Sequence, residues 1–173
     1  MVENVKPQPV EEVLDLLDIL IAYDTVALTA NLDLIGDVKD RLESLGVKVV
    51  LTHDDTHTKA NLFATIGPDV EGGVVLSGHS DVVPVNPSDW TTPPFVANRR
   101  DGRVYGRGTA DMKGFVACVL AMAPTYVELD LTVPIHIALT FDEEDGFHGA
   151  PILLADLKER GVRPSAALIG EPT

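Results

Sequence analysis

The sequence predicts an α/β protein with a layered mixed sheet and flanking helices, and three observations carry that prediction. Short β-branched runs alternate with longer apolar segments at helical spacing, which is typical of strands alternating with helices. The chain has 173 residues, enough for one domain with a substantial core. Hydrophobic residues make up 45% of it and aromatic residues 5%, a balance that fits a globular α/β protein.

Two helices and three strands are expected in the first half of the chain. Residues 10–23 place apolar side chains at helical spacing, and Asn31 is expected to cap a second helix that stops at Gly46. Three strands follow, at 47–51, 61–66 and 73–78. The third is continuously apolar, so it is expected to be central in the sheet and covered on both faces.

The second half begins with a proline-rich loop over 84–98, which is too rich in proline to form a regular element. The elements expected after it are a short strand at 103–105, a helix at 112–126, a strand at 133–141, a helix at 151–160 and a last strand at 166–169. The helix at 112–126 is mostly apolar and should be buried. Cys118 lies within it and is therefore expected to be a buried structural thiol rather than a nucleophile.

Charge and apolar runs exclude several classes of protein. The net charge of −14 argues against a nucleic-acid partner. The single cysteine rules out an internal disulfide bond. The first seven residues lack a basic stretch followed by an apolar one, and no apolar run reaches the roughly 20 residues that cross a bilayer. We therefore expect no membrane association and a cytoplasmic location.

A histidine and an aspartate follow the third strand directly. His79 and Asp81 are two residues apart, so on an extended chain their side chains point to the same side. A metal-bound histidine commonly donates its second ring N–H to a carboxylate, and Asp81 could be that carboxylate. The alternative is a His–Asp hydrogen-bonded pair at the start of a loop.

Asp111 ends a glycine-rich turn and precedes the apolar helix. A carboxylate in such a position can bridge two divalent ions about 3.5–4 Å apart, as two-metal hydrolases require. An aspartate there can equally cap the helix that follows. The residue alone does not decide between these interpretations.

Three adjacent carboxylates, Asp142, Glu143 and Glu144, follow the strand at 133–141. They repel one another, and a cation would offset that repulsion. Because neighbouring side chains face different ways, one glutamate could bind metal while the other acts as a general base. A solvated acidic loop is the alternative.

Glu171 follows the last strand, so four strand ends or adjacent turns each supply an oxygen or imidazole donor. Such positions converge at one edge of an α/β sheet, where these proteins bind ligands. A mixed histidine and carboxylate set without cysteine suits a catalytic zinc, cobalt or manganese site better than a structural zinc site.

Together these residues resemble the M20 family of metallopeptidases and deacylases. The matching segments are SGHSDVVPV at 77–85, GRGTADMKG at 106–114, DEE at 142–144 with Gly146 and Gly149, and GEPT at 170–173. Within the family, the chain is most similar to the acetylornithine deacetylase branch, and the succinyl-diaminopimelate desuccinylases are the nearest competitor. The resemblance implies a zinc-peptidase-like catalytic domain, an N-acyl amino acid as substrate and a role in arginine biosynthesis, with another acyl-amino-acid hydrolase or a dipeptidase of the same family as a further alternative.

The resemblance also implies residue roles and two divalent metal ions, with zinc first and cobalt or manganese as alternatives. His79, Asp111 and Glu171 would hold one ion, and Asp111 with Glu144 the other. Glu143 would be the general base, and Asp81 would orient His79. The peptide bond after Asp111 is expected to be cis.

Length is the main departure from the family, whose members run to roughly twice this size. The resemblance places residues 1–173 in the N-terminal part of the catalytic domain. It implies that a dimerisation domain and a returning segment, with a further histidine ligand, are absent. The full-length protein is expected to be a homodimer, and the catalytic domain of this chain to be incomplete. A non-catalytic metal-binding fragment is the rival hypothesis.

Overall fold

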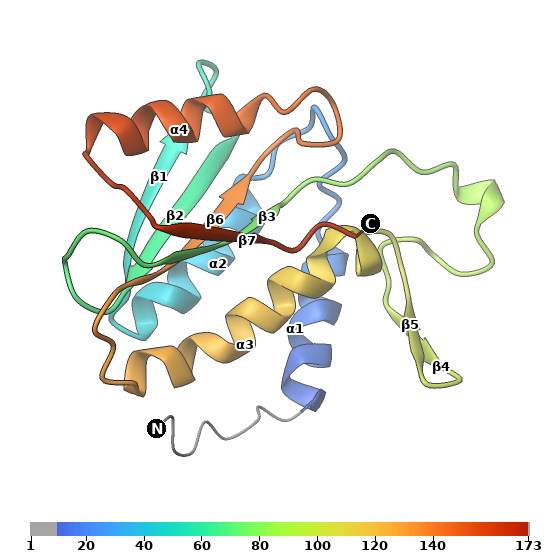
Figure 1. The fold of residues 1–173 in the computed structure, drawn as a ribbon. Helices are drawn as coiled ribbons and strands as arrows, with labels where there is room; N and C mark the ends of the chain where they lie inside the picture. The colour runs from blue at the N-terminus through green and yellow to red at the C-terminus, as the bar shows by residue number, and fades with distance from the viewer. Residues whose placement is uncertain (1–9, 173) are drawn as a thin grey trace.

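A computed structural model describes residues 10–172 of the chain. It contains one five-stranded mixed sheet with helices on both faces, which confirms the predicted α/β class (Figure 1). The helices are α1 (Val10–Ala22), α2 (Leu32–Ser44), α3 (Gly114–Glu128) and α4 (Gly149–Glu159). The expectation about the first seven residues and the family match at Thr173 lie outside the described residues.

The sheet has the strand order β1-β2-β6-β3-β7. Its strands are β1 (Lys48–His53), β2 (Ala60–Ile66), β3 (Val74–His79), β6 (Ile135–Thr140) and β7 (Ala166–Ile169). β3 runs parallel to both β6 and β7, whereas β1 and β2 join as antiparallel strands. The carboxyl ends of β3, β6 and β7 therefore lie at the same edge of the sheet.

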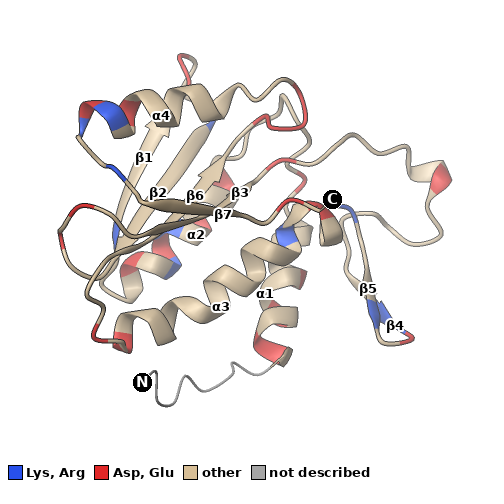
Figure 2. Cartoon of the chain, in the orientation of Figure 1, with Lys and Arg blue, Asp and Glu red and all other residues tan. Residues whose placement is uncertain are grey.

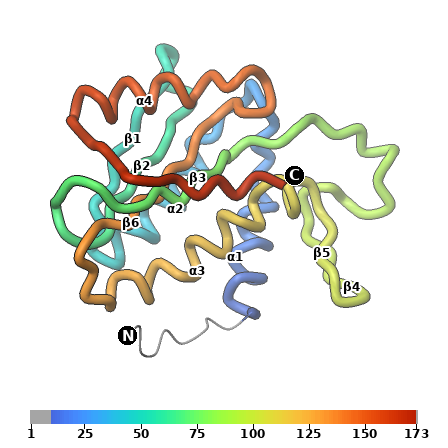
Figure 3. The backbone as a smooth tube through the Cα atoms, viewed as in Figure 1, coloured from blue at the N-terminus to red at the C-terminus, as the bar shows by residue number. Residues whose placement is uncertain are grey.

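Two hydrophobic layers hold the sheet between the helices. On one face, α1, α2 and α3 pack together over apolar side chains of β2, β3 and β6. On the other face, α4 places Leu153 and Leu157 against Phe63, Val75 and Ala138. Figure 3 shows that the 80–98 segment projects away from this layered body. It carries the short helix η1 (Pro87–Asp89) and leads into the hairpin of β4 (Asn98–Arg100) and β5 (Arg103–Tyr105).

The expectation that β3 is an interior strand covered on both faces is confirmed: β3 pairs with both β6 and β7, and apolar side chains pack on each of its faces. Two other expectations were wrong. The side chain of Asn31 makes no capping bond to α2; it bonds to both backbone groups of Ala60 and to Ser80 instead. Cys118 is exposed on the outward face of α3 rather than buried. Because almost every residue of that helix is apolar, its sequence does not distinguish the two faces.

Some element boundaries also differ from the prediction. His79 is the last residue of β3, one residue beyond the predicted strand, and β1 extends to His53, two residues beyond its predicted end. α3 starts at Gly114, because Asp111 and Met112 have non-helical backbone angles. Within residues 10–172, the structure has no helix that is both long and apolar enough to cross a membrane.

Candidate metal centre

The parallel strands bring the candidate residues to one edge of the sheet. β3 ends at His79, the loop after β6 contains Glu143 and Glu144, and β7 is followed by Glu171. Asp111 comes from the turn before α3 and reaches the same place. Acidic segments follow both β6 and β7 at this edge (Figure 2). The structure thus brings together residues that are up to 92 positions apart in the sequence (79 to 171).

The imidazole of His79 lies at the centre of the cluster and is almost completely buried, at 1% exposed. Its Nε2 atom is 3.1 Å from Oδ1 of Asp111 and 3.5 Å from Oε2 of Glu171. Oε2 of Glu143 is 4.0 Å from the same nitrogen. Burial by itself lowers the pKa of His79, but the Asp81 charge and the bonds to Asp81 and Asp111 raise it above its ordinary value.

Asp81 contacts His79 differently from the prediction. Nδ1 of His79 is 2.8 Å from the backbone oxygen of Asp81, while the carboxylate Oδ1 is 3.6 Å away. The Asp81 carboxylate instead accepts hydrogen bonds from the backbone N–H groups of Glu143 and Glu144, each at 3.1 Å. Asp81 therefore links the end of β3 to the acidic loop after β6.

Asp111 is held by an irregular turn rather than by a helix end. Gly108 has a positive φ of 83°, and the peptide bond between Asp111 and Met112 is cis, as the family resemblance implies. The helix-cap interpretation of Asp111 was wrong, because α3 begins three residues later. Sδ of Met112 accepts a hydrogen bond from the backbone N–H of His79 at 3.3 Å, which ties this turn to β3.

The glutamates of the cluster repel one another. Burial, followed by the charge of Asp111, raises the pKa of Glu144 above its ordinary value. The same two causes, in the same order, raise the pKa of Glu171. The charge of His79 acts in the opposite direction, and a bound cation would likewise favour the ionised form of both carboxyl groups.

Two overlapping groups of donor atoms meet the spacing of a metal site. One donor atom each from His79, Asp111 and Glu144 lie within 4.8 Å of one another, and so do atoms from His79, Glu143 and Glu171. The donor chemistry is one imidazole with several carboxylate oxygens, and the crowded carboxylates favour a cation. These residues fit a divalent metal centre of the histidine and carboxylate type.

Three polar residues that support the site were not singled out from the sequence. Lys113 is 1% exposed, and its Nζ donates to the backbone oxygens of Leu20 and Tyr23. Burial lowers the pKa of Lys113 to about 8, against the raising effect of the charges of Asp24 and Asp81. A lysine between apolar residues at the start of an apolar helix was the available signal.

The other two supporting residues are Lys59, which directly precedes β2, and Asn61, which lies within it. Lys59 forms an ion pair with Asp142, and Asn61 bonds to the backbone on both sides of the acidic loop. Their partners are some 80 residues away in sequence, so no local pattern marks them.

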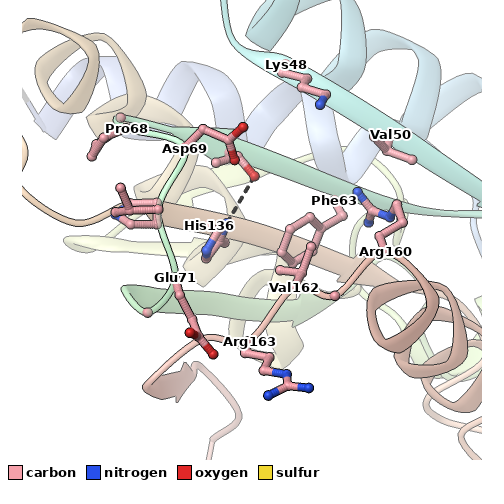
Figure 4. A pocket seen from close by; sticks show the side chains of 16 residues that line it. Lys48, Val50, Phe63, Pro68, Asp69, Glu71, His136, Arg160, Val162 and Arg163 are labelled. Atoms are coloured by element: carbon pink, nitrogen blue, oxygen red, sulfur yellow. Dashed lines mark hydrogen bonds between the residues drawn. The ribbon is translucent and has the colours of Figure 1, made fainter.

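A cavity of about 520 Å³ lies at the opposite end of the sheet (Figure 4). His136 and Phe63 are stacked on its floor, with ring centroids 5.0 Å apart, and Nδ1 of His136 is 3.0 Å from Oγ1 of Thr65. Charged groups of both signs line its rim, and none of the candidate metal ligands does. This cavity is therefore separate from the metal centre.

Comparisons with known proteins agree with this geometry. The model of peptidase family M20/M25/M40 matches residues 75–173, more than half of the chain. The chain belongs to this family. Members of the family are metal-dependent, and the donor groups described above provide candidate ligands in this member.

Two curated relatives are acetylornithine deacetylases. The chain is 39% identical over 153 residues to the enzyme of Proteus mirabilis, which covers 88% of this chain and 38% of that protein. It is 38% identical over 161 residues to the enzyme of Shigella sonnei, which covers 89% of this chain and 41% of that protein. The chain thus spans about two-fifths of the length of these relatives.

Solved structures share the fold. Human carnosine dipeptidase 1 has a TM-score of 0.77 and 26% identity, over 94% of this chain and 38% of that chain. An M20 family metallo-carboxypeptidase of Sulfolobus solfataricus has a TM-score of 0.79 over 92% of this chain and 37% of that chain. Its identity is 23%, so this second likeness shows the fold alone.

Proposed function

We propose that the protein represented by this chain is a metal-dependent amide hydrolase that removes the acetyl group from N-acetylornithine, a step of arginine biosynthesis. The observation that carries the proposal is the convergence of one histidine and four carboxylates at the carboxyl edge of the sheet. The similarity to acetylornithine deacetylases supports the choice of substrate. Residues 1–173 would be the N-terminal segment of the catalytic domain, and the full-length protein a cytoplasmic homodimer.

The metal assignment follows the family resemblance, and it uses four of the five donor residues that lie together at this edge of the sheet. His79, Asp111 and Glu171 would hold one divalent ion, and Asp111 with Glu144 would hold a second. Zinc is our first choice, with cobalt and manganese as alternatives for the same donors. Bound divalent ions polarise an amide carbonyl and lower the pKa of water.

The residues of the chain would then have distinct tasks. Glu143 takes the proton of the attacking water and passes it to the leaving amine. Its Oε2 is 4.0 Å from Nε2 of His79, which puts the carboxylate beside the donor atoms. The backbone oxygen of Asp81 accepts from Nδ1 of His79, which leaves Nε2 directed at Asp111 and Glu171.

The test is a Glu143→Gln variant assayed with N-acetylornithine in the presence of zinc. We expect turnover to fall about 10²- to 10⁴-fold, the usual contribution of a general base, while zinc binding by calorimetry stays unchanged. Asp145→Asn is the matched control, because Asp145 is an exposed carboxylate of the same loop. Turnover close to that of the unmodified chain in Glu143→Gln would refute the assignment of the base.

The same assay separates the rival functions. N-succinyl-diaminopimelate tests for a desuccinylase, and carnosine tests for a dipeptidase, which the likeness to human carnosine dipeptidase 1 favours. If the gel-filtered chain binds zinc and hydrolyses none of the three substrates, it is a non-catalytic metal-binding fragment. Hydrolysis of N-acetylornithine by the same chain would rule that alternative out.

A further inference from the structure

The acidic loop after β6 is held by a buried ion pair that lies outside the metal centre. The carboxylate of Asp142 is 4% exposed and pairs with Nζ of Lys59, whose side chain is 12% exposed. The second oxygen of Asp142 accepts a hydrogen bond from the backbone N–H of Leu28 at 2.8 Å. Both oxygens of this carboxylate are thus occupied by partners from distant segments. Asp142 is not available as a metal ligand in this arrangement.

The backbone of Asp142 is also constrained. Its φ is +49°, a left-handed conformation that residues other than glycine rarely adopt. Its carbonyl oxygen accepts from the N–H of His148 at 3.2 Å, which closes the loop on itself. The two residues that follow direct their N–H groups at the carboxylate of Asp81. The position of Asp142 therefore sets the direction in which the chain presents Glu143 and Glu144.

We propose that Lys59 is a positioning residue for the metal centre, which acts through Asp142 on the loop that carries Glu143 and Glu144. Nζ of Lys59 contacts the carboxylate of Asp142. The backbone N–H groups of the next two residues, Glu143 and Glu144, donate to the carboxylate of Asp81. Asp81 in turn holds His79 by its backbone oxygen. The metal part of this inference rests on the proposed function, whereas the loop-holding part does not.

The physical reason is the cost of an unpaired buried charge. Without the lysine, the Asp142 carboxylate would remain buried with a single hydrogen bond, a strongly unfavourable state. The loop would move to bring that carboxylate to water, and the bonds of Glu143 and Glu144 to Asp81 would open. A purely structural ion pair would lower the stability of the fold as a whole without opening these two bonds selectively.

The first experiment measures hydrogen exchange of the Glu143 and Glu144 amides in metal-free protein by NMR. In Lys59→Met, we expect both amides to exchange at least about tenfold faster, while amides in the middle of β2 and β6 change less. Lys59→Arg should restore slow exchange, because it restores the charge. Lys39→Met is the matched control, since Lys39 pairs with Glu43 on the exposed surface of α2. Unchanged exchange of the two amides in folded Lys59→Met would overturn the proposal.

A second variant keeps the test decisive if Lys59→Met does not fold. The double variant Lys59→Met with Asp142→Asn removes both charges, so no unpaired ion remains. It should fold and should still show faster exchange at Glu143 and Glu144, although less so than Lys59→Met, because the bond from Lys59 to the loop is lost even though no unpaired charge drives the loop towards water. Slow exchange of both amides in this variant would equally overturn the proposal.

Zinc titration by calorimetry then tests the link to the metal centre. We expect Lys59→Met to bind zinc about 10- to 100-fold more weakly, as is usual when a residue that supports metal ligands is lost, and Lys59→Arg to recover much of the affinity. Zinc affinity unchanged in Lys59→Met would refute the positioning role. If the unmodified chain binds no zinc, the proposed function fails, and the exchange experiment still decides whether Lys59 holds the loop.

Discussion

The two sides of the metal centre are built very differently. Glu143 and Glu144 follow β6, the middle strand, and their loop is tied to β2, to β3 and to the segment before α2. Glu171 follows β7, an edge strand that, among residues 10–172, pairs only with β3 and whose four residues are all exposed. One side is therefore fixed by the fold of this chain. The other side depends on a strand with one open edge and little covering.

The largest expected effect on stability comes from replacing Asn61, whose side chain holds the loop that carries Glu143 and Glu144. This side chain is fully buried; its Oδ1 accepts from the N–H of Phe141 at 3.3 Å, and its Nδ2 donates to the oxygen of Gly149 at 3.0 Å. Asn61→Ala leaves the buried N–H of Phe141 without a partner, at about 1–3 kcal/mol, and removes one hydrogen bond from the oxygen of Gly149, at about 0.5–1.5 kcal/mol. We expect urea unfolding to show a loss of about 3 kcal/mol. Asn98→Ala, on the peripheral strand β4, should cost less than about 0.5 kcal/mol.

A loss below about 1 kcal/mol in Asn61→Ala would mean that the loop is not fixed by the fold, and the contrast between the two sides would disappear. Gly149→Ala offers an independent check of the same contact. A methyl group there would lie 2.5 Å from Oδ1 of Asn61, too close for any ordinary contact. This variant should therefore be destabilised as well.

The same contrast explains how far the sequence predicts this molecule. Strands and the residues at their ends follow from local periodicity, so His79, Asp111 and Glu171 could be placed near one another. Contacts between β2 and the loop after β6 depend on the strand order, which no local pattern encodes. Residue type can also mislead about a side chain's role. Asparagine is common at helix N-caps, yet the side chain of Asn31 bonds to Ala60 and Ser80 instead of capping α2. The sequence therefore predicts the candidate metal ligands better than it predicts the residues that hold them in place.

The exposed edge of β7 should cause copies of the chain to associate. Leu168 and Ile169 of β7 are 55% and 64% exposed, and an edge strand offers unpaired backbone groups to another chain. We expect concentration-dependent self-association in sedimentation equilibrium, and Ile169→Lys should weaken it about tenfold, by placing a charge on the edge. Val70→Lys is the control, since Val70 is similarly exposed in a loop. Equal association of both variants would mean that β7 is not the contact surface.

The smallest expected effect concerns Glu171 and pH in the metal-free chain. Its folded-state pKa lies above the ordinary value of 4.5, chiefly because of burial and the charge of Asp111. The stability linked to this carboxyl is therefore complete below about pH 4.5 and is lost as the pH rises through the folded-state pKa. Since the side chain is 37% exposed, solvent screens the effect, and Glu171→Gln should raise stability at pH 7 by less than about 1 kcal/mol. Near pH 4 the difference should vanish.

Added zinc should reverse the order of stability of the two chains, because zinc stabilises a chain according to its affinity for that chain and Glu171→Gln lacks one ligand. Thermal unfolding with added zinc and with a chelator measures the stability difference under both conditions. If zinc stabilises Glu171→Gln as much as the unmodified chain, Glu171 is not a zinc ligand.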